Sequence, residues 1–251
     1  MEDSKEYLKR KSFFNKVITI YGRNAVLEAL LDRSLEIYKL HLSDSNQKSS
    51  DIDRLISLAK KRGIESAYHN KKALSRISKN AKQDQGVALD IVLKHSLDED
   101  EFIASKSTYR VLAIDGVNNP QNLGMIIRSA TAGDIDAILL PKKGVADISP
   151  LVIKASVGTI FRMPIIKCDN LSNTLKKFQS NSAKIYTLSS YAKDSYKDVE
   201  YNNRAIFVLG NESNGVSDEV EKLSDKSISI PMNRGVESLN VAVTASLLAF
   251  M

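Results

Sequence analysis

Three short stretches rich in glycine, asparagine and proline constrain this sequence most, because each has its turn-forming residues just after an apolar run typical of a buried strand. They cover 115–130, 205–215 and 228–246, and they hold five of the eleven glycines and two of the five prolines. Apolar runs that alternate with segments of helical spacing predict a mainly parallel sheet flanked by helices. Loops at the carboxyl ends of such strands meet at one edge of the sheet, where ligands bind. The three stretches are therefore candidates for a functional site, although tight structural turns have the same composition.

The early part of the chain predicts a small α/β domain of its own. Asp51 is the expected N-cap of a helix over 51–62, and Gly63 its stop. An acidic, serine-rich segment with little apolar periodicity predicts a linker. The predicted organisation is an N-terminal extension (1–17), a first domain (18–94), the linker (95–109) and a second domain (110–251). Further helices are expected at 24–33 and 71–77, and strands at 37–42, 64–68, 86–92, 111–115, 137–140, 163–166, 184–188, 205–209 and 227–230.

Charge points to the class of partner. The chain has 36 Lys and Arg against 30 Asp and Glu, a net charge of +6, which favours nucleic acid. Between residues 60 and 82, eight basic side chains accompany one acid, Glu65. Such a cluster can bind phosphates, although a solvated helix face has the same composition. The cluster consists of Lys60, Lys61, Arg62, Lys71, Lys72, Arg76, Lys79 and Lys82.

Several classes of protein are disfavoured. No apolar run approaches the roughly 18–20 residues of a membrane span, and the first twenty residues lack a signal-peptide core. The single cysteine, Cys168, excludes an intramolecular disulfide and a Cys-rich zinc site. His41, His69 and His95 lie far from the three stretches, so we expect no metal and no catalytic histidine. These observations predict a reduced, cytoplasmic protein that does not span a membrane.

The first stretch predicts a strand, a turn and a helix. The strand ends at Asp115, Pro120 fixes the turn, and a helix is expected to begin near Asn122. Gly124 permits a close approach of the backbone, and Arg128 follows one turn later. A helix N-terminus with a nearby arginine can hold an anion, although an ordinary strand–turn–helix with a surface arginine looks the same.

The second and third stretches place polar residues after strands. One strand runs into Gly210, with Glu212 and Gly215 in the loop that follows. No lysine follows that loop and no G-x-G-x-x-G occurs, which disfavours a P-loop and a dinucleotide-dependent oxidoreductase. In the third stretch, Ser238 is the expected cap of an apolar closing helix, within which Asn240 would need hydrogen-bond partners.

In this order and spacing, the three stretches resemble the motifs of the SpoU/TrmH family of RNA ribose methyltransferases. Residues 122–128 match Asn-x-Gly-x-x-x-Arg, 210–212 match Gly-x-Glu, and 230–241 contain Ile-Pro-Met followed by Ser-Leu-Asn-Val. Residues 20–30 resemble the start of the family's ribosomal-protein-L30e-like substrate-binding domain. The resemblance implies an L30e-like α/β domain followed by an α/β-knot (SPOUT) methyltransferase domain. Its trefoil knot is something that periodicity could not have predicted.

The resemblance also implies a cofactor and a set of site residues. Gly210, Ile230 and Leu239 match positions whose main chain holds the adenosine part of S-adenosylmethionine. Arg128 matches the arginine proposed to activate the ribose 2′-hydroxyl. The polar residues grouped around that arginine correspond here to Asn122, Glu212, Ser238 and Asn240.

Two roles for Arg128 stay open, because a guanidinium is almost always protonated and is therefore an awkward base. Burial near the cofactor's positive sulfur could remove the proton of Arg128, or Arg128 could anchor the target phosphate while another group acts as the base.

Three residues depart from the family pattern at the edge of the site. Arg234 and Ser213 stand where many relatives have glycine, and Asn119 replaces a frequent aspartate.

The expected reaction is S-adenosylmethionine-dependent 2′-O-methylation of a guanosine in large-subunit ribosomal RNA. An L30e-like domain is more typical of the members that act on ribosomal RNA, which is an argument by analogy. The alternatives are a transfer RNA 2′-O-methyltransferase and a catalytically silent RNA-binding or ribosome-assembly factor of the same fold. The family usually forms homodimers, so the apolar residues 241–251 belong either to such an interface or to the core.

Overall fold

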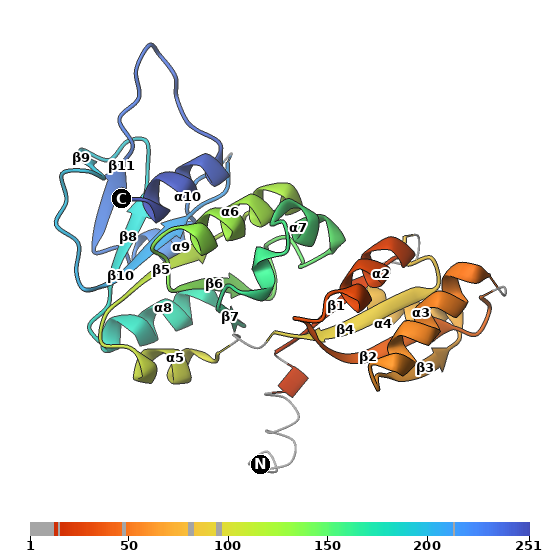
Figure 1. Ribbon diagram of the computed structural model, residues 1–251. Helices are drawn as coiled ribbons and strands as arrows, with labels where there is room; N and C mark the ends of the chain where they lie inside the picture. The colour runs from red at the N-terminus through yellow and green to blue at the C-terminus, as the bar shows by residue number, and fades with distance from the viewer. Residues whose placement is uncertain (1–12, 15, 47–48, 80–82, 94–96, 213) are drawn as a thin grey trace. The chain divides into compact units, whose positions relative to one another are not determined.

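The computed structural model describes residues 13–14, 16–46, 49–79, 83–93, 97–212 and 214–251. The chain forms two compact units: a first unit of 1–94 with 148–150, and a second unit of 95–147 with 151–251 (Figure 1). Most of the predicted N-terminal extension lies outside the described residues, as do Lys82, His95 and Ser213.

The first unit is built on a four-stranded mixed sheet in the order β1-β4-β2-β3. Strand β4 pairs antiparallel with β1 and β2, and β2 pairs parallel with β3. Side chains such as Leu40, Leu89 and Ile91 are fully buried and form its core. Its elements are β1 (Val17–Tyr21), α2 (Arg23–Leu31), β2 (Glu36–Ser43), α3 (Ser50–Lys61), β3 (Glu65–His69), α4 (Lys71–Ser78) and β4 (Val87–Val92).

Helix α3 shows how local sequence produces this unit. Its buried residues, Ile52, Leu55 and Ala59, recur at the spacing that places them on one face. The N-cap is Ser49, whose hydroxyl accepts a hydrogen bond from the main-chain N–H of Ile52. The prediction of Asp51 as the cap is therefore wrong. Asp51 lies in the first turn, where its charge favours the helix dipole.

The second unit is built on a seven-stranded sheet in the order β7-β6-β5-β10-β8-β11-β9, and every pair in it is parallel. The six strands predicted in this half all form within two residues of their predicted ends. Its strands are β5 (Tyr109–Ile114), β6 (Ala137–Pro141), β7 (Ile165–Cys168), β8 (Lys184–Leu188), β9 (Asp194–Ser195), β10 (Arg204–Leu209) and β11 (Lys226–Ser229). Its helices are α5 (Glu99–Ser105), α6 (Pro120–Ala132), α7 (Pro150–Ala155), α8 (Leu171–Ser180), α9 (Asp218–Glu221) and α10 (Val241–Ala249), with a 3-10 turn, η1 (Thr159–Phe161).

Helices cover both faces of this sheet (Figure 1). On one face, Phe102 of α5, Phe178 of α8 and Val220 of α9 pack into a buried cluster with apolar side chains of the strands. Helices α6 and α10 lie side by side on the other face. Arg110 fixes the end of α10 there, since its guanidinium donates to the main-chain oxygens of Leu248 and Met251.

Part of the predicted linker is an ordered helix. Asp98 and Glu101 form a capping box that begins α5, and Phe102 is 1% exposed in the core of the second unit. Lys177 of α8 forms ion pairs with Glu99 and Asp100. The prediction of a linker is therefore wrong for Glu99–Ser105, because capping and one buried aromatic outweigh the weak apolar periodicity.

Candidate active site

The three stretches meet at the carboxyl edge of the second unit's sheet. Strand β5 pairs with β10, and β8 lies between β10 and β11, so the loops that follow these strands leave from neighbouring positions. Asp115 follows β5, Gly210 follows β10 and Ile230 follows β11. Parallel strands bring such loops together at the edge where ligands bind in open α/β sheets.

Hydrogen bonds join one residue from each stretch. The side-chain amide of Asn122 donates to Oε1 of Glu212 at 2.5 Å, and the amide of Asn240 donates to the same oxygen at 3.0 Å. Asn240 also donates to Oδ1 of Asn122 at 3.1 Å. Asn122 is buried, while Glu212 and Asn240 are exposed. We refer to these three residues as the amide–carboxylate cluster.

Helix caps hold two members of this cluster in place. Helix α6 begins at Pro120, two residues earlier than expected, because the side chain of Asn119 caps it by accepting from Gln121 and Asn122. Asn240 is the N-cap of α10, and its Oδ1 accepts from the main-chain N–H of Ala242. The prediction of Ser238 as that cap is therefore wrong, as is the expected placement of Asn240 inside the helix.

Close packing orders the loop after β10. A Cβ atom on Gly210 would lie 2.1 Å from the carbonyl carbon of Gly215 and 2.2 Å from the nitrogen of Val216. The loop closes through paired main-chain hydrogen bonds of 2.8 Å between Asn211 and Gly215. Only glycine fits at position 210, so the loop that carries Glu212 depends on it.

Two residues that sequence reasoning missed tie the loops to each other. Asn211 donates from its side chain to the main-chain oxygen of Gly116, and Asp115 accepts from the main-chain N–H of Ser217. Both bonds connect the loop after β5 with the loop after β10. The available signal was a pair of Asx residues directly after two strands, because Asx side chains often bond to nearby main chain in turns.

Helix α6 also packs tightly at its first half. A Cβ atom on Gly124 would lie 2.5 Å from Cβ of Ala155 and 2.7 Å from the main-chain oxygen of Val152. This contact with α7 explains the glycine in the first motif as a point of close helix packing, as the sequence predicted.

Arg128 and Ser238 are exposed, and neither joins the amide–carboxylate cluster. Within the described part of the chain, neither side chain forms a hydrogen bond or an ion pair. Arg128 lies on the outer face of α6, one turn after Met125, whose side chain is also exposed. A guanidinium free of protein partners is available to bind an external anion.

The main chain at the three predicted cofactor positions is free to bind a ligand. Gly210, Ile230 and Leu239 are half-buried, and their N–H and C=O groups form no hydrogen bond with any other described residue. Half-buried main-chain groups need partners, and an adenosine offers both donors and acceptors. The residues present therefore fit the main-chain recognition that the motif implies.

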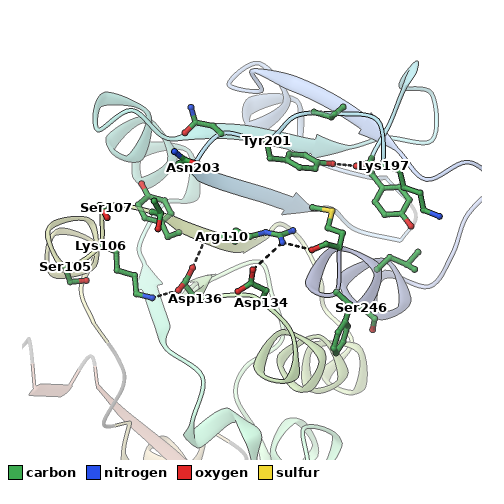
Figure 2. Close-up of a pocket in the computed structure, with 18 of the residues that line it drawn as sticks. Ser105, Lys106, Ser107, Arg110, Asp134, Asp136, Lys197, Tyr201, Asn203 and Ser246 are labelled. Atoms are coloured by element: carbon green, nitrogen blue, oxygen red, sulfur yellow. Dashed lines mark hydrogen bonds and ion pairs between the residues drawn. The ribbon is translucent and has the colours of Figure 1, made fainter.

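A separate pocket lies beside α10, next to the starts of β5 and β10 (Figure 2). Figure 2 shows Arg110, at the start of β5, beside Asp134, in the loop between α6 and β6. Tyr201, Lys197 and Ser246 also line the pocket. None of the predicted site residues lines it, so it is distinct from the candidate active site.

The structure also bears on metal sites, membrane-spanning helices and the single cysteine. Among the residues that the structure describes, no group of three His, Cys, Asp or Glu side chains is arranged to hold a metal, and no helix is long and apolar enough to cross a membrane. Burial raises the pKa of the Cys168 thiol to about 11, while a hydrogen bond with Thr174 acts to lower it. His41 and His69 lie in the first unit, where their rings are hydrogen-bonded to each other and His41 contacts Asp90.

Comparison with known proteins identifies the family. Residues 109–250 match the SpoU rRNA Methylase family, and residues 19–96 match the family described as RNA 2'-O ribose methyltransferase substrate binding. The chain belongs to the SpoU family of RNA methyltransferases. The resemblance seen in the three motifs is thereby confirmed.

Relatives extend over nearly the whole chain. A protein of Staphylococcus saprophyticus, named for the TrmH family of tRNA/rRNA methyltransferases, is 32% identical over 237 residues, which are 93% of this chain and 94% of that one. YacO of Bacillus subtilis, also named for that family, is 30% identical over 236 residues, 92% of this chain and 93% of its own. These SpoU relatives match both units.

Solved structures support the same fold. AviRb of Streptomyces viridochromogenes, a SpoU methyltransferase in complex with AdoMet, superposes with a TM-score of 0.65 at 17% identity, covering 98% of this chain and 91% of AviRb. An AdoMet-bound rRNA methyltransferase from Sinorhizobium meliloti gives a TM-score of 0.64 at 20% identity, covering 96% and 88%. The SpoU chain thus has the α/β fold of these methyltransferases, with an N-terminal substrate-binding domain.

Proposed function

We propose that this SpoU enzyme methylates the 2′-hydroxyl of a guanosine ribose in large-subunit ribosomal RNA, in the cytoplasm. The amide–carboxylate cluster is the observation that carries the proposal. It fixes Glu212 between two helix N-termini, at the edge where the motif residues for the cofactor have free main-chain groups. A ribose hydroxyl that enters beside Arg128 would face this cluster.

The chemistry required of the protein is mainly orientation. S-adenosylmethionine supplies a methyl group on a positively charged sulfur, which is already a good leaving group. Aligning the ribose oxygen with that methyl group can lower the barrier by roughly 7–11 kcal/mol in ideal cases. Removal of the hydroxyl proton by a general base adds a factor of about 10²–10⁴.

We assign Arg128 to the phosphate of the target nucleotide. Its side chain is exposed and has no protein partner among the described residues, whereas burial would be needed to remove the proton from a guanidinium. A guanidinium binds phosphate through two parallel hydrogen bonds, which would fix the ribose beside it. Glu212, held by Asn122 and Asn240, is the better-placed group to accept the hydroxyl proton. We assign Ser238, exposed just before α10, to a contact with the ribose.

The first unit would hold the RNA through its basic helices. Six of the eight side chains in the predicted cluster are exposed, on the end of α3 and along α4. Arg62 is an exception, because its guanidinium donates to the main-chain oxygens of four residues at the end of α2 and the loop after it. The exposed side chains that we assign to phosphates are Lys60, Lys61, Lys71, Lys72 and Arg76.

We further propose that the enzyme is a homodimer in which the outer face of α10 meets a second copy. Val243 on this helix is 43% exposed, its C-cap Phe250 is 65% exposed, and Met251 follows at 36%. Ala242, Ala245 and Leu248 on its inner face are buried, so the helix serves the core and leaves a second apolar face uncovered. Sedimentation or light scattering of the wild type and of V243K/F250K tests this arrangement.

The reaction is tested with a methyl-labelled cofactor. The enzyme is incubated with labelled S-adenosylmethionine and separate pools of unmodified ribosomal and transfer RNA, and the labelled nucleoside is identified after digestion. Label on a guanosine ribose of the large-subunit RNA is the expected result. Label on transfer RNA would instead make the enzyme a transfer RNA methyltransferase. Cofactor binding without methyl transfer to either pool would favour an RNA-binding or assembly factor.

A further inference from the structure

Tyr191 and Arg234 are exposed at the carboxyl edge of the second unit's sheet, and the proposed reaction gives neither side chain a role. Tyr191, in the loop after β8, is 94% exposed. Arg234, in the loop between β11 and α10, is also exposed, and this loop extends away from the sheet in Figure 1. In the described part of the chain, neither side chain has a hydrogen bond, an ion pair or a ring contact.

The loop that carries Tyr191 is hydrogen-bonded to β11, the strand from which the loop of Arg234 continues. The main-chain N–H of Ser189 donates to the oxygen of Ile228 at 3.0 Å, and that of Tyr196 donates to the oxygen of Ser229 at 2.8 Å. Strand β9 pairs with β11 directly before the loop of Arg234 begins. The two loops therefore leave the sheet side by side.

The backbone holds Tyr191 outward. Ala192 donates from its main-chain N–H to the oxygen of Ser189, and Tyr191 donates to the hydroxyl of Ser189. This tight turn places the ring at its tip, away from the core. An aromatic ring that is fully in water gains no burial in the free protein, but it offers a flat face to a nucleic-acid base.

The backbone at Arg234 favours glycine, yet the residue there is arginine. Its φ is +57° and that of Gly235 is +74°, in a turn closed by the main-chain N–H of Val236 and the oxygen of Asn233. A residue with a Cβ is strained in this left-handed conformation, and glycine is not. Despite this strain, the Arg234 side chain forms no hydrogen bond, ion pair or ring contact with the described residues. This indicates that the guanidinium binds an external partner.

We propose that Tyr191 and Arg234 are positioning residues for the RNA strand next to the target nucleotide, with Tyr191 stacking on a base and Arg234 binding a phosphate. Single-stranded RNA is recognised by aromatic stacking on splayed bases and by arginine on the backbone. Arg234 stands between Ile230 and Leu239, so its loop spans the two proposed cofactor positions. The inference rests on the proposed entry of RNA at this edge.

The test compares KM for RNA with kcat and with cofactor affinity. Using whichever unmodified RNA pool the wild type methylates, we expect Tyr191→Ala to raise KM about five- to a hundred-fold, while Tyr191→Phe stays near wild type. Both Tyr191 variants should retain kcat and the affinity for S-adenosylmethionine, because the Tyr191 side chain does not contact the amide–carboxylate cluster. For Arg234→Gly, the slope of log RNA affinity against log salt concentration should become shallower by about 0.7, because one phosphate contact is lost.

Two matched variants control for strain and for charge. Ser182→Gly relieves another left-handed residue, φ +66°, after α8, and Lys176→Gln removes an exposed charge from α8. Both should keep wild-type KM and salt dependence. Equal KM for Tyr191→Ala and wild type, or an unchanged salt slope for Arg234→Gly, would overturn the proposal. A wild type that methylates no RNA contradicts the proposed function instead, and direct RNA binding of the variants then still decides this inference.

Discussion

Asn122 donates a hydrogen bond to Oε1 of Glu212 at 2.5 Å, although 90 residues of chain separate them. Asn240 reaches the same carboxylate oxygen from the start of α10. One acidic side chain is thus oriented by two helices that the fold brings together only in the finished second unit. The orientation of Glu212 is therefore a property of the tertiary structure.

We expect Asn122→Ala to reduce kcat by roughly 10- to 100-fold, since a hydrogen bond to a charged group contributes about 1.5–3 kcal/mol. Asn122→Asp should be at least as damaging, because a second carboxylate would face Glu212. Single-turnover methylation with saturating cofactor measures the change. Gln121→Ala alters an exposed side chain in the same turn and should remain active.

Arg128→Ala should abolish methyl transfer while leaving the affinity for S-adenosylmethionine unchanged. If Arg128 binds the target phosphate, Arg128→Lys should keep partial activity with a raised KM for RNA, because lysine retains the charge without the paired donors. A loss of kcat in Arg128→Lys with unchanged KM would instead make it the base. Kinetics at several RNA concentrations, together with a thermal-shift titration of the cofactor, separate these results.

The sequence predicts the sheet of the second unit well, because its strands are continuous apolar runs and its loops carry glycine and asparagine. Prediction from the sequence fails where a single side chain determines whether or where a helix begins. Asp98 and Phe102 turn an acidic segment into helix α5, and Asn240 rather than Ser238 caps α10. The contact of Asn122 with Glu212 joins distant motifs, so only the family resemblance could suggest it. Side-chain caps and long-range bonds leave no periodic signal.

Gly210→Ala should destabilise the loop after β10 and weaken cofactor binding. Its added methyl group would lie 2.1 Å from the carbonyl carbon of Gly215, and overpacking of this kind costs about 1–3 kcal/mol. Gly144→Ala is a suitable control, since that glycine has positive φ but no atom within 4 Å of an added Cβ. A larger loss of cofactor affinity in Gly144→Ala than in Gly210→Ala would contradict the assignment of the loop.

Asp225 should contribute a pH-dependent part of the stability of the second unit. Burial opposes its ionisation, but hydrogen bonds from the main chain of Ile185 and from the side chains of Lys184 and Gln179 outweigh it and hold the pKa of the carboxyl below 3.8. The unfolded chain therefore takes up this proton first as the pH falls. The stabilisation is complete above the unfolded pKa and is lost as the pH drops through 3.8 toward the folded value. Urea unfolding of wild type and Asp225→Asn between pH 3 and 6 should converge at the acid end.

Arg62 and Lys61 are neighbours in the sequence, yet we expect opposite effects from them. The guanidinium of Arg62 donates to the main-chain oxygens of Ala29, Leu30, Asp32 and Leu35. Arg62→Ala should therefore lower the free energy of unfolding of the first unit by about 2–4 kcal/mol, since several charged hydrogen bonds are lost.

Lys61→Ala should instead leave stability within about 0.5 kcal/mol of wild type. Its exposed ammonium is free to bind phosphate, so RNA affinity should fall and its salt dependence should become shallower. Thermal unfolding and RNA binding at several salt concentrations give both quantities for each variant. If Arg62→Ala were as stable as wild type but bound RNA more weakly, Arg62 would be a phosphate-binding residue. Its hydrogen bonds to the four carbonyl oxygens would then contribute little to stability.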